Sequence, residues 1–316
     1  MNTKVLAIRR QLAAGILLAS LSPGLPNTVV QPVDRRELVG SIKRLTRNTR
    51  WQLVSSTRLA FQSFHPQGLV KLGDSYFLSS VEVLEKPGTI KTGVSDAVRT
   101  PGKGIGHLFH FDASGKMLND LRLGEGAVYH PGGIDFDGHY LWVPVAEYRP
   151  DSRSIIYRID PRTLKSIEIL RWNDHIGAVA YDESSRTLTA ASWGSRKFYK
   201  WQARKGHSFR LLTSWSNPSF FIDYQDCKQL GPEKVLCNGI SSYEIPGQKE
   251  KLVIGGLALV DTSRGITEYE FPMDLRTPDG ISMNRNPFWI ETAPSGLRLY
   301  FIPEDDNSTL YIYESK

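Results

Sequence analysis

Three histidines recur at the starts of similar short phrases along the chain. They stand in His65-Pro-Gln-Gly-Leu, His130-Pro-Gly-Gly-Ile and Asp-His175-Ile-Gly-Ala, and a fourth phrase, Thr277-Pro-Asp-Gly-Ile, carries Asp279. Grouped imidazoles bind transition metals or transfer protons near neutral pH. Either chemistry requires a fold that brings the phrases to one place.

A second apolar run follows each phrase about ten residues later, and polar or aromatic residues end these runs. Glu82 and Glu147 end the runs of the first two units, and Trp193 and Glu304 take the corresponding places further along the chain. These side chains should lie near the imidazoles, provided that each phrase and its following run are neighbouring antiparallel strands.

Self-similarity with a period of roughly 40–50 residues and several short strands per unit predicts an all-β fold, the β-propeller. Four units contain four strand-like runs each, whereas the last unit contains only three. The orphan run 51–59 is expected to complete the last blade and close the ring. We predict five four-stranded blades, with six as the alternative if a long segment of unit one or four hides another sheet. A β-sandwich would explain the number of strands but not the repeated phrase.

In each blade the first strand starts, and the second strand ends, on the same face of the disk. The residues at these positions should therefore ring one mouth of the central channel. No catalytic role is assigned to any of them. The predicted binding residues are His65, Glu82, His130, Glu147, His175, Trp193, Asp279 and Glu304.

His65, His130 and His175 are the predicted ligands if the site holds one divalent metal ion, since imidazole with carboxylate suits Zn, Mn, Fe or Ni. The same His and Glu pairs suit general acid–base chemistry. Two structural alternatives stay open. Each imidazole would then hold its loop to a neighbouring blade, and Trp193 would serve in packing.

The phrase resembles the Pro-x-Gly-Ile/Val strand openings of NHL-type propellers and of the group that includes gluconolactonase-like and strictosidine-synthase-like proteins. Residues 65–80, 130–145 and 277–283 carry this resemblance. Gluconolactonase-like propellers hold a channel cation by carboxylate and amide oxygens, and this chain departs from that pattern with histidines in three of five positions. The whole chain looks most like an uncharacterised family of secreted propeller proteins, a resemblance that implies no particular reaction.

The N-terminus has the composition of an export signal. Basic residues precede the apolar run 12–21, and Ser22-Pro23-Gly24 follows it, so residues 1–24 are predicted to be a signal peptide or an uncleaved anchor. Residues 25–50 are predicted to be a basic linker or short helix before the propeller, 51–316. We expect a secreted or periplasmic protein without a membrane span beyond such an anchor.

Charge is unevenly distributed along the chain. Residues 1–50 hold nine of the 39 Lys and Arg but only two of the 33 Asp and Glu, which leaves 30 basic and 31 acidic residues for the rest. The propeller is therefore close to neutral, and a nucleic-acid-binding surface is not expected.

Cys227 and Cys237 flank the turn signal Gly231-Pro232-Glu233. A hairpin centred there would place the two residues opposite each other, and in an exported protein we predict a disulfide. Two buried thiols are the alternative.

From these features we predict an exported propeller that binds a small molecule at a His- and Glu-rich channel mouth, with or without a divalent metal. A hydrolase or lactonase is the enzymatic version of this prediction. The alternative is a non-catalytic module that binds a protein or a glycan and whose histidines are structural, because the propeller scaffold hosts both kinds of function.

Overall fold

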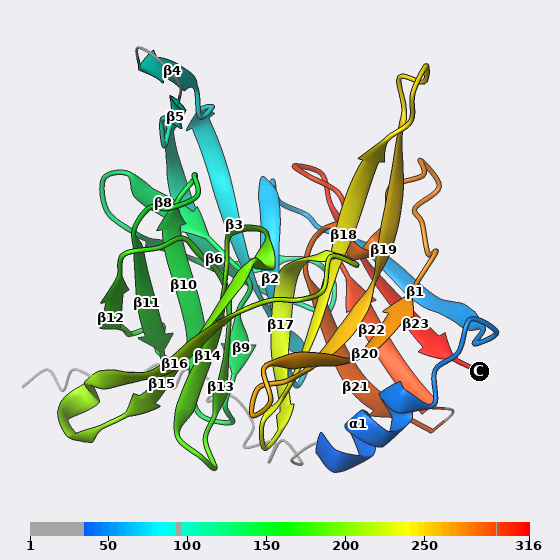
Figure 1. Cartoon of the computed structure of the whole chain (residues 1–316). Coiled ribbons are helices and arrows are strands. Elements are labelled where there is room, and N and C mark those ends of the chain that lie inside the picture. Colours follow the sequence, from blue (N-terminus) through cyan, green and yellow to red (C-terminus); the bar gives the residue numbers. More distant parts are fainter. Residues whose placement is uncertain (1–34, 93–95, 295) are drawn as a thin grey trace, which may run out of the picture. The chain divides into compact units, whose positions relative to one another are not determined.

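The computed structural model describes residues 35–92, 96–294 and 296–316. They form a β-propeller of five antiparallel four-stranded blades (Figure 1), so the predicted fold is confirmed with five blades rather than six. The predicted signal peptide or anchor, 1–24, and the first part of the predicted linker lie outside the described residues. No helix in the described ranges is long and apolar enough to cross a membrane.

The strands of blades one to four follow one another outward from the axis in chain order, and blade five differs in its outermost strand. Blade one contains β2 (His65–Leu72), β3 (Ser75–Glu85), β6 (Lys103–Asp112) and β7 (Met117–Leu123). Blade two contains an innermost strand in two pieces, β8 (Val128–Pro131) and β9 (Asp135–Phe136), then β10 (Leu141–Glu147), β11 (Ser154–Ile159) and β12 (Ser166–Trp172). Blade three contains β13 (Ile176–Asp182), β14 (Thr187–Ser192), β15 (Lys197–Ala203) and β16 (Phe209–Ser216). Blade four contains β17 (Asp223–Gly231), β18 (Lys234–Glu244), β19 (Lys251–Asp261) and β20 (Ile266–Pro272), and blade five contains β21 (Phe288–Ala293), β22 (Gly296–Phe301), β23 (Thr309–Ser315) and β1 (Trp51–Arg58).

The outermost strand of blade five comes from the other end of the chain. β1 pairs antiparallel with β23, from Trp51 opposite Ser315 to Arg58 opposite Thr309. This pairing supplies the strand that the last unit lacks, and it confirms the predicted closure. The ring closes because backbone groups of β23 that would otherwise lie at an open edge are hydrogen-bonded.

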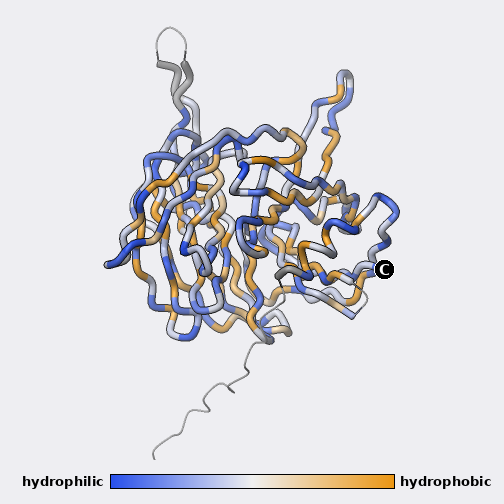
Figure 2. The backbone as a smooth tube through the Cα atoms, turned by 60° about the horizontal axis from the view of Figure 1, so that its bottom comes forward, coloured by the Kyte–Doolittle hydropathy of each residue, from blue (hydrophilic) through white to orange (hydrophobic). Residues whose placement is uncertain are grey.

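Five hydrophobic clusters hold the blades together, one at each interface between neighbouring blades. The interface of blades one and two, for example, packs Val70 and Phe77 against Val143 and Val145. Figure 2 shows the corresponding hydrophobic stretches along the strands. Packing between blades, rather than a single central core, therefore holds the scaffold rigid around its axis.

Glycines of the repeated phrase lie where the innermost strands meet. A Cβ on Gly132 would lie 2.1 Å from the carbonyl oxygen of Gly177, and one on Gly68 would lie 2.5 Å from the backbone nitrogen of Ile134. Both contacts are impossible, so any side chain there would push neighbouring strands apart. The recurrence of glycine before each apolar run thus reflects the close approach of backbones at the axis.

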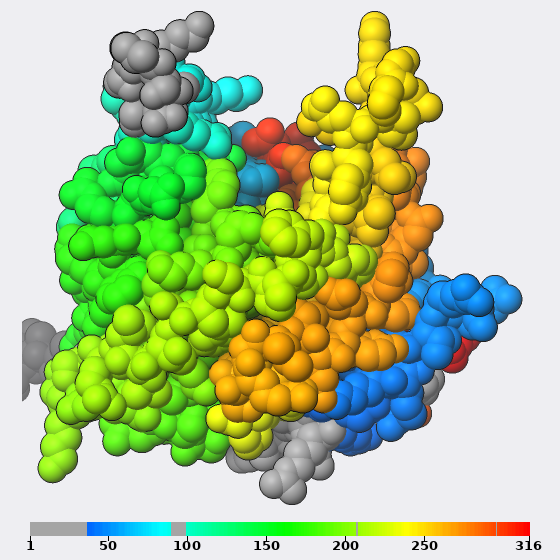
Figure 3. Space-filling view, viewed as in Figure 1, coloured from blue at the N-terminus to red at the C-terminus, as the bar shows by residue number. Residues whose placement is uncertain are grey.

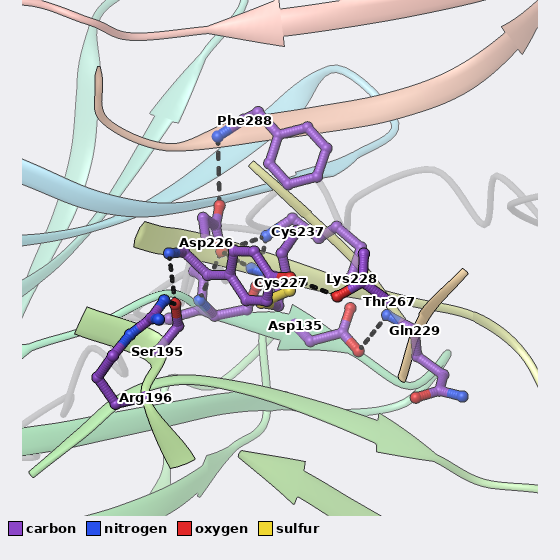
Figure 4. Close-up of a disulfide and its surroundings, with 12 residues drawn as sticks. Asp135, Ser195, Arg196, Asp226, Cys227, Lys228, Gln229, Cys237, Thr267 and Phe288 are labelled. Atoms are coloured by element: carbon purple, nitrogen blue, oxygen red, sulfur yellow. Dashed lines mark hydrogen bonds and ion pairs between the residues drawn. A yellow bond between two sulfur atoms is a disulfide. The ribbon is translucent and has the colours of Figure 1, made fainter. Parts of the chain in front are cut away.

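A buried carboxylate links the innermost strands of four blades. Asp226 of β17 is fully buried and accepts hydrogen bonds from the backbone N–H groups of Leu69 (3.0 Å), Ile134 (3.0 Å) and Phe288 (3.3 Å). The Lys228 ammonium, 2 % exposed, donates to it at 2.7 Å (Figure 4). Burial raises the pKa of Asp226 to about 6, against the effect of the neighbouring ammonium. We call Asp226 and Lys228 the axial pair.

The first propeller strand in the chain, β1, begins at Trp51, and a short helix packs beside the propeller before it. Helix α1 (Arg35–Lys43) precedes β1, and Leu38, Ile42 and Leu45 are buried in the cluster between blades four and five. Their spacing of four and three residues places them on one face of a helix, a signal that the basic composition of the segment obscured. The described part of the predicted linker therefore belongs to the fold.

The innermost strand of blade five also starts later than predicted. The phrase at Thr277 forms a turn that ends at Gly280, with a φ of +82°, and Met283–Arg285 forms a 3-10 helix. The strand itself is β21, whose Phe288 donates to Asp226 as Leu69 and Ile134 do. The error arose because turn and strand openings share the Pro-x-Gly pattern.

Cys227 and Cys237 form a disulfide, as predicted. They lie directly opposite each other on β17 and β18, next to the axial pair (Figure 4), and both are buried.

Removing this disulfide should destabilise the native protein without rearranging it. Replacing both cysteines by serine opens a short loop and buries two hydroxyls, and we expect a loss of about 2–4 kcal/mol of unfolding free energy. Denaturant unfolding of the parent and the double variant, each checked by thiol alkylation and mass spectrometry, measures the loss. Two alkylated thiols in the untreated native parent would contradict the bond.

Candidate functional site

The three predicted histidines lie next to one another at one end of the innermost strands. The ring centroids of His65 and His130 are 6.4 Å apart, and those of His130 and His175 are 5.9 Å apart. His65 begins β2, His130 lies in β8, and His175 directly precedes β13. Three successive blades thus contribute one imidazole each to a single row.

Hydrogen bonds at Nδ1 orient the two outer imidazoles of this row. His65 Nδ1 lies 2.8 Å from Asp305 Oδ1, and His175 Nδ1 donates to the backbone carbonyl of Glu147 at 2.8 Å. A partner at Nδ1 fixes the ring and directs Nε2 towards whatever binds there.

The central imidazole differs from the outer two. His130 is 5 % exposed and packs against the Tyr148 ring at 4.1 Å between centroids. Neither ring nitrogen of His130 has a hydrogen-bond partner among the described residues. Buried polar groups almost always have a partner, so His130 marks a position for a ligand atom or an ordered water.

Burial keeps two of the imidazoles neutral. Desolvation lowers the pKa of His175 to about 4, although the hydrogen bond to the Glu147 carbonyl opposes the shift. Desolvation also lowers the pKa of His130 well below its usual value, and His175 and His65 add to the effect. Neutral imidazoles both donate and accept hydrogen bonds, which suits an uncharged polar ligand group.

Acid should therefore destabilise the protein through His175. Its folded pKa is depressed below the unfolded value of about 6.5, so the unfolded chain binds more protons between about pH 6.5 and 4, and stability falls as the pH falls through that window. His175→Asn keeps a donor near the Glu147 carbonyl but does not titrate. Between pH 7 and 4.5 we expect the parent to lose about 2–3 kcal/mol more unfolding free energy than this variant. Equal losses in urea titrations would contradict a buried neutral imidazole.

No group of three or more His, Cys, Asp or Glu side chains in the described part of the chain is arranged to hold a metal ion. Hydrogen bonds at Nδ1 orient the His65 and His175 rings, as is common for metal-ligating imidazoles. The three imidazoles are nevertheless not arranged around one point where a metal ion could lie. The divalent metal stays a prediction, and no chemical step is derived from it.

A cleft of about 640 Å³ opens beside His65. Figure 3 shows the surface hollowed between two projecting arms, one at the far ends of β3 and β6, the other at the far ends of β18 and β19. The hairpin of β4 (Thr89–Thr92) and β5 (Asp96–Arg99) connects β3 to β6. The volume is that of a small-molecule site. The cleft is lined by Gln62, Phe64, His65, Val81, Glu82, Val83, Lys86, Pro87, Arg99, Tyr148, Arg285, Asp305 and Asp306.

Charges in the cleft are balanced, and some are already paired. Arg285 Nη2 lies 2.6 Å from Asp305 Oδ2, and the same carboxylate contacts His65. Burial acts against ionisation of Asp305, but the hydrogen bond from His65 and the charge of Arg285 lower its pKa. Lys86 and Arg99 add positive charge to the walls.

Of the predicted carboxylates, Glu82 lines the cleft, whereas three others lie elsewhere. The Glu147 side chain is 1 % exposed and binds Arg149 and Arg153 of the following loop. Burial opposes ionisation there, but these hydrogen bonds outweigh it and lower the pKa of Glu147. Glu304 accepts a hydrogen bond from the Tyr311 hydroxyl within blade five. Asp279 is exposed in a turn. None of these three carboxylates lines the cleft, because a position at a strand end does not by itself set the side-chain direction.

Trp193 follows β14 and forms part of an aromatic wall. Its ring contacts His175 edge-on at 4.7 Å and Tyr148 at 6.0 Å. The Arg99 guanidinium lies over both aromatic rings, 5.4 Å from the Tyr148 centroid and 5.2 Å from that of Trp193. Arg99 thus connects the projecting hairpin of blade one to the row of imidazoles.

The sequence did not indicate Asp305 or Arg285, which come from loops of blade five that lack the repeated phrase. Asn286-Pro287 is the local counterpart of His65-Pro66, and Asn286 donates to Asp305 at 3.2 Å. This Asn-Pro step just before β21 was the available signal. His107, to which the sequence assigned no role, lies behind Glu82.

Comparison with solved structures finds distant similarity. A tail fibre of Staphylococcus aureus phage P68 is 11% identical with a TM-score of 0.47, over 88% of this chain and 55% of that one. A luciferin-regenerating enzyme is 10% identical with a TM-score of 0.46, over 84% of this chain and 95% of that one. The β-propeller domain of Cps50 (Swd1) from Myceliophteria thermophila is 10% identical with a TM-score of 0.39, over 84% and 99% of the two chains.

These similarities carry no argument about function. The chain spans about half the length of the tail fibre. No curated protein matches the sequence. A sequence family does match, over residues 31–316, a range that includes both α1 and the propeller. The chain belongs to this family, the family of unknown function DUF6454.

Proposed function

We propose that this protein binds a small molecule in the cleft beside His65, and that the ligand reaches the adjoining imidazoles of His130 and His175, the polar floor of the proposed site. The observation that carries the proposal is His130, a buried imidazole whose two nitrogens have no partner among the described residues. Leaving such groups without partners costs about 1–3 kcal/mol, which a ligand supplying a donor and an acceptor would recover.

The chemistry of the floor and walls indicates the class of ligand. His130 and His175 are neutral, and Tyr148, which lines the cleft, supplies an aromatic ring. The cleft has no excess of one charge, since Lys86, Arg99 and Arg285 face Glu82, Asp305 and Asp306. A small hydroxylated or carbonyl-bearing molecule such as a sugar or sugar lactone fits this combination better than a polyanion.

Export is part of the proposal. The Cys227–Cys237 disulfide supports it, because such bonds persist mainly in oxidising compartments.

Ligand-observed NMR with hexoses, hexose 1,5-lactones and hydroxy acids tests the proposal. We expect at least one of these probes to bind the parent, and His130→Ala to weaken its binding at least tenfold, because one hydrogen-bonded floor group is worth about 1.4 kcal/mol or more. His139→Ala, on an exposed turn of blade two, is the matched control.

Two other outcomes would favour different functions. A melting temperature that rises with Zn²⁺ or Mn²⁺ in the parent but not in His130→Ala would favour the metal site. Absence of binding by every probe would contradict the proposal. It would favour a macromolecule-binding face, for which the arms offer the exposed side chains of Leu84, Tyr243 and Leu252.

A further inference from the structure

A row of three titratable side chains runs outward from the cleft through blade one. Glu82 of β3 lines the cleft, and its Oε2 lies 3.6 Å from His107 Nε2 on β6. His107 Nδ1 lies 2.9 Å from Asp120 Oδ1 on β7. The row therefore joins the cleft to the outer strand of the blade, and it is separate from the row of imidazoles at the channel mouth.

Packing fixes the imidazole in the middle of this row. The His107 side chain is 4 % exposed and packs against the rings of Phe64 and Phe109, at 5.1 Å and 4.9 Å between centroids, and these two rings also contact each other at 6.2 Å. Phe64 lines the cleft and holds a φ of +54°, a conformation that costs a bulky residue energy and that occurs preferentially at functional sites. This aromatic cluster and the burial of the side chain leave the His107 ring little contact with water.

The hydrogen bonds of His107 assign a role to each nitrogen. In the neutral ring, Nδ1 donates to Asp120, so Nε2 presents a lone pair towards the Glu82 carboxylate. Nε2 has no hydrogen-bond partner among the described residues. A single proton between Nε2 and Glu82 would turn this contact into a hydrogen bond. The imidazole of His107 would then be hydrogen-bonded to a carboxylate on each side.

The other side chains around His107 do not supply that proton. Ser80 on β3 and Arg122 on β7 stand opposite His107 in the register of the sheet, and Arg122 is exposed. Phe64 and Phe109 are apolar. The charged groups that face the imidazole are thus Glu82, Asp120 and, from the surface, Arg122.

We propose that Glu82 is the acid–base group of the cleft and that His107 is a positioning residue that shares its proton. Glu82 would take a proton from a water or ligand hydroxyl, the proton would rest between Glu82 and His107 Nε2, and it would return to the ligand on the reverse transfer. Only a proton moves, so no oxidant, reductant or further reactant is needed. The inference rests on the proposed function in so far as the cleft must hold a ligand with such a group.

Imidazole ¹⁵N NMR of the full protein without ligand tests the shared proton. At constant pH we expect the His107 Nε2 signal to differ between the parent and Glu82→Gln, since the neutral amide cannot share the proton that lies between Nε2 and the carboxylate. Glu85→Gln is the matched control, because Glu85 lies on the same strand but pairs with Lys103 at the surface. His110, which stacks on Phe77, is the internal reference and should not move in either variant.

An unchanged His107 Nε2 signal in Glu82→Gln, in a variant with the parent's melting temperature, would overturn the proposal. Because the measurement uses no ligand, its failure is distinguishable from failure of ligand binding. Where a probe binds, Glu82→Gln should remove the pH dependence of its conversion or exchange, and Glu85→Gln should preserve it. A purely structural His107 would leave both readouts unchanged.

Discussion

Replacing Asp226 by alanine is expected to be the most damaging single change in this protein. It leaves the Lys228 ammonium buried without its partner and orphans backbone N–H groups of Leu69, Ile134 and Phe288 in three other blades. Breaking a buried pair costs about 3–5 kcal/mol, and each orphaned donor adds about 1 kcal/mol or more. The total is comparable to the whole stability of a typical domain, so we expect no folded protein at 37 °C.

Lys228→Met is the matched comparison, because it breaks the same pair but leaves the amide donors bonded to Asp226. We expect it to cost clearly less than Asp226→Ala in denaturant unfolding. Equal losses would show that the ion pair, rather than the bonds to the innermost strands, accounts for the effect. A folded Asp226→Ala protein with the stability of the parent would contradict the role of the axial pair.

Shortening the chain from its N-terminal side is expected to give the second largest effect. A chain that starts at Trp51 lacks α1 and exposes the surface that covers Leu38, Ile42 and Leu45. At about 1.5–3 kcal/mol for each buried side chain, we expect a loss of about 5 kcal/mol or more of unfolding free energy relative to a chain that starts at Gln31. Calorimetry and denaturant unfolding of the two chains measure this loss.

Removing β1 as well should cause the protein to aggregate, in addition to lowering its free energy of unfolding. A chain that starts at Ala60 exposes the edge of β23, which then offers unpaired backbone groups to other molecules. Light scattering of chains that start at 31, 51 and 60 separates the two effects. Equal stability of the first two chains would contradict the burial of α1, and a monodisperse, stable third chain would contradict closure by β1.

The sequence by itself determined the architecture because its strongest signals are local. Glycines before apolar runs recur where backbones crowd at the axis, as at Gly68 and Gly132, and a missing strand in the last unit predicted closure by 51–59. The turn at Gly231-Pro232-Glu233 likewise predicted that Cys227 and Cys237 would be opposite each other. The spacing of glycines and apolar residues and the preferences of turn residues act within a few positions, so they can be recognised from the sequence alone.

Only the tertiary structure decided which side chains meet. His65 contacts Asp305, 240 positions away, and Asp226 bonds to Leu69 across 157 positions. No local pattern encodes such pairs, because the blade twist and side-chain direction that create them depend on packing of all five blades. The three imidazoles could be expected to lie near one another from the repeat, but the approach of Glu82 to His107 on the neighbouring strand could not. Phe64, from the connection before β2, and Phe109, from β6 itself, pack against this imidazole only in the folded blade.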